Sequence, residues 1–223
     1  MAGIAGLYST LPKHTSSQVV ALLTNAIKIE NDPTNQQMTL WLLTVAIQQE
    51  ASFWSAGLAS SENSQVPVTM LLMCSIVSKA ARYKAPVMFT AFECLRHLSL
   101  VCEELYGHAT SSVVHLVSAC CDFIVASKPV LRSNRAPFFL EELMGAAYRC
   151  VTEWVAVTPL LLTKPAVVSK IISAVIDANE RAGSTTARMT IAPVREASQK
   201  LLSMLMKHHV AQLEADTGGL DEK

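Results

Sequence analysis

Residues 137–181 read PFFLEELMGAAYRCVTEWVAVTPLLLTKPAVVSKIISAVIDANER, two apolar segments punctuated by prolines. Apolar side chains in both segments recur every three or four residues, the spacing that gathers them on one face of an α-helix. These residues are Leu140, Leu143, Ala147, Val151 and Trp154 in the first segment, and Val168, Ile171, Ile172, Val175 and Ile176 in the second. Proline is tolerated in the first turn of a helix but costs about 3 kcal/mol in its interior, so prolines mark helix starts. The stretch predicts helices over 137–158 and 165–181.

The same pattern continues over the rest of the chain. It predicts six further helices, over about 15–29, 35–52, 67–83, 86–106, 112–127 and 193–213. Gly107 is expected to end the helix over 86–106, and the Thr and Ser residues at 110–112 can cap the next one. No segment shows the alternation of apolar and polar residues between turns that is typical of strands. We therefore predict an all-α protein.

The eight predicted helices form pairs that recur roughly every 50 residues, close to the 40–47 residues of HEAT and armadillo repeats. This period predicts an α-solenoid of about four stacked helix pairs over residues 15–214. An N-terminal segment, 1–14, precedes it, and a flexible tail, 215–223, follows. The sequence has no residue-level repeat consensus, and the helix over 67–83 is apolar on nearly all sides. An irregular globular helical bundle is therefore the alternative.

The composition limits the kinds of partner. Of 223 residues, 51% are apolar and 16% are charged, so the chain can bury a large core and still expose apolar surface to neighbours. Its formal net charge is zero and it has no basic stripe, so we expect no nucleic-acid partner. The longest apolar stretch, residues 66–77, falls short of the roughly 20 residues that cross a bilayer, so we expect no membrane span.

The cysteines indicate the compartment. All six lie in predicted helices among apolar neighbours: Cys74, Cys94, Cys102, Cys120, Cys121 and Cys150. We interpret them as buried thiols of a cytoplasmic protein rather than as a disulfide framework. Residues 1–10 have neither the charged region nor the long apolar run of a signal peptide, which agrees with a cytoplasmic location.

Patterns for catalysis, cofactors or metals are missing from the sequence. It contains no G-x-S-x-G nucleophile turn, no G-x-G-x-x-G and no P-loop. Cys94 and His97 could meet on one helical turn, but a zinc site would need two more ligands. His115 does not share a ligand-forming face well with Cys120 or Cys121. We therefore expect no catalytic residue, cofactor or metal, and we interpret these cysteines as core residues.

One segment is a candidate partner-contact loop. Lys128, Arg132 and Arg135 lie between the helices over 112–127 and 137–158, in a segment with Pro129 and Pro137. Three positive charges on a connecting loop could dock an acidic partner protein. The alternative is an ordinary solvated loop.

The last third of the chain carries several motifs in a definite order. Residues 146–155 read AAYRCVTEWV, residues 159–162 read PLLL, and an aliphatic helix follows around 167–176. After a polar insert, residues 194–197 read VREA and lead to a leucine pair, Leu201 and Leu202. In order and spacing, these roughly 65 residues resemble the large non-catalytic region of Ral GTPase-activating protein subunits.

The resemblance implies a function for the chain. Subunits of this family are long α-solenoids that pair as a heterodimer and accelerate GTP hydrolysis by the small GTPase Ral. Catalysis in the family belongs to a carboxy-terminal α/β domain with an inserted asparagine, and no segment here corresponds to that domain. The resemblance therefore implies a scaffold segment without enzyme activity, whose protein partner is the other subunit of the complex. A free-standing adaptor that binds peptides or partner helices in its groove is the alternative, and an independent enzyme is a third class.

Overall fold

The computed structural model describes residues 13–57, 64–79, 82–131, 137–179 and 192–218. Within these ranges every element of secondary structure is helical and no strand occurs, which confirms the all-α prediction. The elements are α2 (Lys13–Ile29), α3 (Pro33–Ser55), α4 (Val66–Ser78), α5 (Ala85–His97), η1 (Leu98–Val101), α6 (Cys102–Leu131), α7 (Phe139–Val157), η2 (Pro159–Thr163), α8 (Pro165–Asn179) and α9 (Ala192–Gly218).

Prolines open helices as the sequence predicts. Pro33 lies in the first turn of α3 and Pro86 in the first turn of α5. At α3 the preceding Asp32 is also a side-chain cap, because its Oδ1 accepts the backbone N–H groups of Asn35 and Thr34 at 3.1 and 2.8 Å. The Asn35 bond first, and then the Thr34 bond, lower the pKa of Asp32, since both favour the charged carboxylate.

The predicted break between residues 106 and 112 is present, two residues after Gly107. Gln48 of α3 donates to the carbonyl oxygen of His97, and Ser55 of α3 donates to Glu104, so α5, η1 and the first turns of α6 follow α3 in one direction. Gly107 lies in these first turns of α6. The backbone leaves helical geometry at Ala109 (φ −137°, ψ 38°), so α6 consists of two helical stretches that meet at a kink there. A glycine inside a helix costs about 1 kcal/mol relative to alanine, which the packing of α6 against α4 and α7 can offset.

The same helix also continues past its predicted end at residue 127. It passes through Pro129 and ends at Leu131. Proline removes the N–H that would bond the carbonyl of Val125, and the helix has only two further residues after Pro129.

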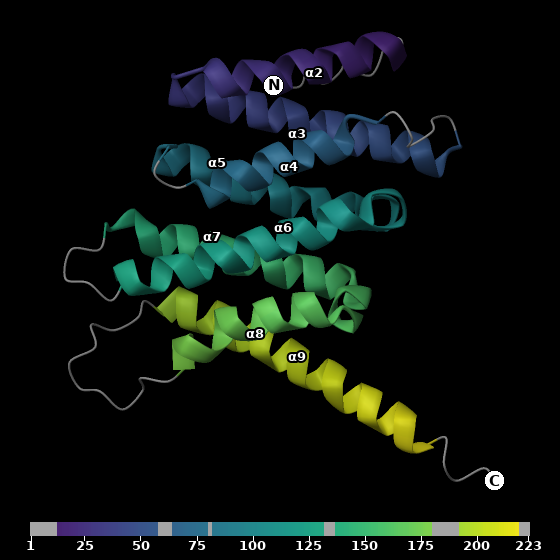
Figure 1. Cartoon of the computed structure of the whole chain (residues 1–223), viewed down its shortest axis with the longest axis vertical. Coiled ribbons are helices and arrows are strands. Elements are labelled where there is room, and N and C mark those ends of the chain that lie inside the picture. The colour runs from purple at the N-terminus through teal and green to yellow at the C-terminus, as the bar shows by residue number, and fades with distance from the viewer. Residues whose placement is uncertain (1–12, 58–63, 80–81, 132–136, 180–191, 219–223) are drawn as a thin grey trace.

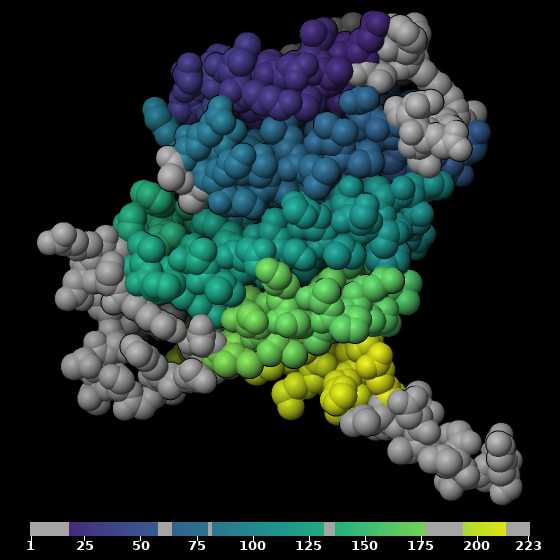
Figure 2. Space-filling view, viewed as in Figure 1, coloured from purple at the N-terminus to yellow at the C-terminus, as the bar shows by residue number. Residues whose placement is uncertain are grey.

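The helices pack in two layers. In one layer α3 contacts α5, α5 contacts α7 and α7 contacts α9, while in the other α4 contacts α6 and α6 contacts α8. Helices of the two layers pack in consecutive pairs, α2 with α3, α4 with α5, α6 with α7, and α8 with α9. These pairs follow one another along the long axis of the molecule, and α9 projects at the carboxy-terminal end (Figure 1; Figure 2).

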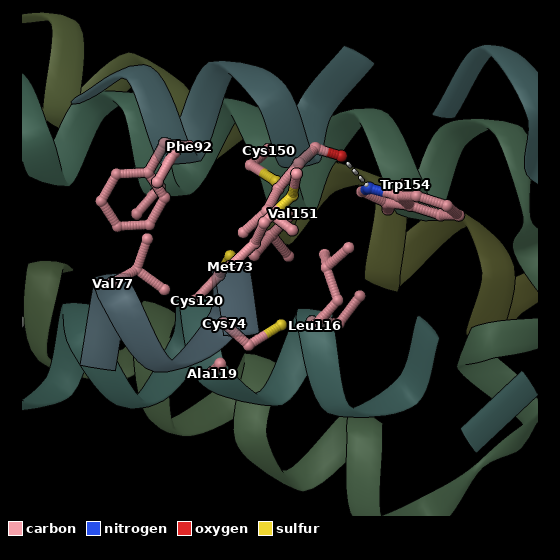
Figure 3. Close-up of a cluster of buried hydrophobic side chains, with 14 of the residues drawn as sticks. Met73, Cys74, Val77, Phe92, Leu116, Ala119, Cys120, Cys150, Val151 and Trp154 are labelled. Carbon is pink, nitrogen blue, oxygen red and sulfur yellow. Dashed lines mark hydrogen bonds between the residues drawn. The ribbon is translucent and has the colours of Figure 1, made fainter. Parts of the chain in front are cut away.

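One continuous apolar core runs through these contacts, from Val20 on α2 to Leu201 on α9. Figure 3 shows its middle, where α4, α5, α6 and α7 contribute side chains. Aliphatic and sulfur-containing residues fill most of this region, together with the rings of Phe92 and Phe123, whose centroids lie 5.0 Å apart. The core therefore joins each helix pair to the next one rather than closing within a pair.

Buried polar atoms fix the register between helices. Trp154 Nε1 on α7 donates to the carbonyl oxygen of Leu95 on α5 at 2.9 Å. On another side of α7, Tyr148 Oη donates to the carbonyl oxygen of Ala174 on α8 at 2.6 Å. The sequence predicts Trp154 to be buried against the helix now seen as α8. The side chain is fully buried, but its hydrogen bond joins α7 to α5 (Figure 3).

We expect Trp154→Ala to lower the free energy of unfolding by about 3–5 kcal/mol, the usual cost of removing a buried large aromatic side chain. Trp154→Phe keeps much of the buried apolar volume and loses only the hydrogen bond and part of the ring, so it should cost clearly less. Urea unfolding followed by circular dichroism measures both. Equal costs for the two variants, or a cost below about 1 kcal/mol for alanine, would contradict this account.

Candidate functional site

The structure contains an apolar groove of about 890 Å³. It lies where the end of α4, the start of α5, the second half of α6 and the start of α7 meet. Five buried side chains line it from within, the apolar Met88, Phe123, Leu140 and Leu143 and the polar Ser127. More exposed residues line its walls: Tyr83, Pro86, Val130, Pro137 and Phe139. We call this set of residues the α5–α7 groove. Its volume is in the range of small-molecule and peptide side-chain pockets.

Few charges border the α5–α7 groove. Among its described lining residues the ionisable ones besides Tyr83 are Lys84 and Asp122, and both are exposed. Asp122 forms an ion pair with Lys170 of α8. Neither cysteine nor histidine is among the described lining residues. The groove therefore offers apolar contact with a polar edge, the usual make-up of a ligand or peptide pocket.

Of the three positive residues in the predicted partner-contact loop, the structure describes one, Lys128. Lys128 lies in α6 rather than in a loop, because that helix continues to Leu131. Its side chain is buried, and its Nζ donates to the carbonyl oxygen of Ser173 on α8 at 2.9 Å. Arg132 and Arg135 lie outside the described residues. The structure thus gives Lys128 a place in the contact between α6 and α8.

Five of the six cysteines are buried, as the sequence predicts, and Cys102 is half-buried. All six are free thiols. Burial raises the pKa of the Cys94 thiol to about 12, and it raises those of Cys74 and Cys121 further. For Cys120 a hydrogen bond with Cys150 is the first cause of a raised pKa, and burial is the second. Thiols held in this way are poor nucleophiles and poor metal ligands, since both roles need the thiolate.

The residue pairs considered for metal binding point in different directions. His115 is exposed, whereas Cys120 and Cys121 are buried. His97 packs its ring against Trp41, with centroids 5.3 Å apart. Among the described residues no group of three or more His, Cys, Asp or Glu side chains is close enough to hold a metal ion.

One helical stretch in the described part of the chain is long and apolar enough to cross a membrane. It covers Ala85–Leu131, that is α5, η1 and α6, with a mean hydropathy of 1.6 in its most apolar window. Just over half of that window (56%) is buried within the protein, and the core helices of soluble proteins pass the same test of length and composition.

Sequence reasoning did not find the α5–α7 groove. Its lining residues come from four helices and are separated by up to 65 positions, from Ser78 to Leu143. A period along one helix shows which residues point inward but not where two helix pairs leave a hollow between them. The nearest local signal is the aromatic pair Phe138–Phe139 at the start of α7, since both side chains are exposed at a helix end.

Comparison with known proteins yields no match: no family model fits the chain, and no curated protein or solved structure is significantly similar to it.

The raised thiol pKa values make stability depend on pH. In the unfolded chain thiols titrate near pH 8.5, while Cys94 in the folded chain titrates near 12. The contribution of the protonated Cys94 thiol to the free energy of unfolding is therefore complete below about pH 8.5, and it is lost as the pH rises towards 12. Between about pH 9 and 10.5, the free energy of unfolding of the wild type should fall as the pH rises. In Cys94→Ala this fall should be smaller by about 1.4 kcal/mol per pH unit, because the titrating thiol is gone.

Urea unfolding over this pH range measures the slope. Leu98→Ala is the matched control, because it also removes buried volume from the same region but no titrating group. It should lower stability at every pH and leave the slope unchanged. Parallel pH curves for wild type and Cys94→Ala would show that this thiol ionises equally in both states.

Proposed function

We propose that this chain is a non-catalytic scaffold segment of a Ral GTPase-activating complex, arranged as an α-solenoid of four helix pairs and acting in the cytoplasm. In this role it contributes architecture and subunit contacts, and regulates the small GTPase indirectly. Its partner is the other subunit of the complex.

The order of helix contacts carries the proposal. Each helix from α3 to α7 contacts the second helix after it, so the two layers grow by adding pairs at one end. This is how helical-repeat proteins build extended surfaces for partners, because each repeat contacts only its neighbours. An irregular bundle would also bury an apolar core, but it has no reason to keep this order over several pairs.

The positions of the residues that carry the family resemblance also support the proposal. Residues 146–155 lie in α7 and residues 159–162 in η2, while the aliphatic segment forms α8 and the Arg-acidic-Ala motif opens α9. Most of the apolar ones are buried, including Trp154 and Leu201. They are therefore packing residues, and what they share with the family is the arrangement of consecutive helices.

We expect the purified chain to leave the intrinsic GTP hydrolysis rate of Ral unchanged, even in large excess. Acceleration needs a residue that stabilises charge in the transition state or positions the attacking water. The sequence has no counterpart of the family's catalytic domain. Single-turnover hydrolysis of GTP by Ral, with and without the chain, measures this, and a rate increase by the chain alone would refute a scaffold role.

In the same proposal the immobilised chain should retain a Ral GTPase-activating complex or its other subunit. Because its formal net charge is zero, binding should depend on apolar contact and persist from about 50 to 500 mM salt. An immobilised unrelated helical-repeat protein is the control. Failure to retain either subunit at any salt concentration would count against the family assignment.

A free-standing adaptor is the second candidate function, and the α5–α7 groove is the observation that favours it. The groove is apolar, has exposed aromatic and proline residues on its walls, and is bordered by the ends of several helices. Grooves of this kind accept apolar side chains of a peptide or of a partner helix.

Phe139→Glu tests the groove directly. It puts a charge on the wall of the groove at a position that is 45% exposed, so the fold should tolerate it. If a retained partner binds in the groove, its affinity should fall about tenfold or more, since burying an unpaired carboxylate is costly. Leu160→Glu, an exposed leucine outside the groove's described lining, is the matched control. Equal affinities for the two variants would place the partner elsewhere.

A further inference from the structure

One edge of the α5–α7 groove is positively charged. The segment that joins α4 to α5 contains Lys79, Arg82 and Lys84, and all three side chains are exposed. The sequence has no Asp or Glu from residue 63 to residue 92, so this segment has no acidic residue to balance them. Lys84 is itself one of the residues that line the groove. A group of negative charge is therefore favoured at this edge.

Lys84 has no ion-pair partner among the described residues. The carboxylate that it attracts is Asp32, which already accepts two backbone N–H groups at the start of α3. Arg82 has contacts of its own, because its Cζ lies 5.8 Å from the centroid of the Tyr83 ring and its Nη2 donates to the carbonyl oxygen of Lys28. Lys84 is thus the cation of the groove lining that can still pair with the carboxylate of a partner.

The acidic residues around the groove have other roles. Asp122, the acidic residue in its described lining, forms an ion pair with Lys170 of α8. Glu141 and Glu142 are neighbours of Leu140 in the sequence, but neither lines the groove. Both lie in the first turn of α7, where acidic side chains stabilise the helix end. The charge that the groove offers to a partner is therefore positive.

The walls of the groove are open to solvent. Phe139 and Val130 are 45% and 47% exposed, although both line it. A small-molecule site usually encloses most of its ligand, whereas a groove with exposed walls can accept side chains of a segment that continues beyond it. Tyr83, Pro86 and Pro137 add rigid apolar surface to these walls, of the kind that peptide-binding grooves present. The shape favours a peptide segment as the occupant.

We propose that the α5–α7 groove binds an acidic segment of a partner protein, with large apolar side chains of that segment in the groove and an Asp or Glu beside Lys84. This binding mode rests on the adaptor function proposed above and adds the chemistry of the partner. Affinity comes mainly from the apolar contacts in the groove. The carboxylate selects among partners, since charges at the rim of an interface contribute more to specificity and association rate than to affinity.

A phage-displayed library of random short peptides, with the full chain as bait, tests the proposal. We expect the enriched peptides to share an aromatic or large aliphatic residue with Asp or Glu close to it in sequence. With Lys84→Glu as bait, Lys or Arg should replace the acidic residue. The matched control is Lys164→Glu, which reverses an exposed charge outside the described lining of the groove and should enrich the same acidic peptides as wild type.

Fluorescence anisotropy of one enriched peptide then measures its affinity. Lys84→Glu should weaken binding about fivefold, because attraction at an exposed site becomes repulsion. A peptide with Lys in place of its acidic residue should recover affinity for that variant. Phe139→Ala should weaken both peptides about tenfold, since it removes apolar contact from the groove and changes no charge. Both positions are exposed, and circular dichroism should show the same helix content for every variant.

The results separate the acidic partner from the adaptor function. Peptides that Phe139→Ala weakens, but that have no acidic preference or keep their affinity for Lys84→Glu, would overturn the acidic partner and leave the groove a binding site. No enrichment, or binding that Phe139→Ala does not change, would overturn both.

A second copy of the chain is the other occupant to test. Sedimentation equilibrium should give the monomer mass of 24.2 kDa. A dimer that Phe139→Ala dissociates would place the second copy in the groove and overturn the proposal.

Discussion

The burial of aliphatic side chains between one helix pair and the next is the constraint on which this structure depends. Most helices here have apolar residues on more than one side, so packing within a pair leaves part of the apolar surface uncovered. α4 is the extreme case, since it is apolar on nearly all sides and contacts α2, α3, α5 and α6. The continuous core from α2 to α9 is the result. Some aliphatic side chains of α8 and α9 stay exposed, Ile176 and Met206 among them.

Aromatic side chains add direction to this otherwise non-directional burial. Trp154 and Tyr148 are fully buried, and each has one polar atom that must find a partner. Both donate to a helix carbonyl, one on α5 and the other on α8. These two bonds fix the position of α7 along its axis relative to both neighbouring helices. Aliphatic contact alone would tolerate a shift of one turn between neighbouring helices more easily than these two bonds do.

Much of the fold could be predicted from the sequence because apolar spacing and prolines are local signals. Helices α2, α3, α7 and α8 start and end within a few residues of their predicted bounds. The end of α6 was placed too early, because the helix continues through Pro129 for two further residues, and so close to the helix end the proline removes a single backbone bond. The surroundings of Lys128 could not be predicted in the same way, because its partner, Ser173, is 45 residues away on another helix. The α5–α7 groove was missed for the same reason, and the described residues that line it show no shared motif.

The sequence separation between hydrogen-bonded residues of different helices sets how long each residue waits for its partner during translation. Those of α7 and the one between α6 and α8 join residues between 26 and 59 positions apart. At about 5–20 residues per second, the ribosome delivers the partner of Leu95 roughly 3–12 s after Leu95 itself. Each helix pair can thus be covered by its successor while later parts are still being translated. A chain this rich in apolar residues would otherwise expose them to chaperones and to other nascent chains until translation ended.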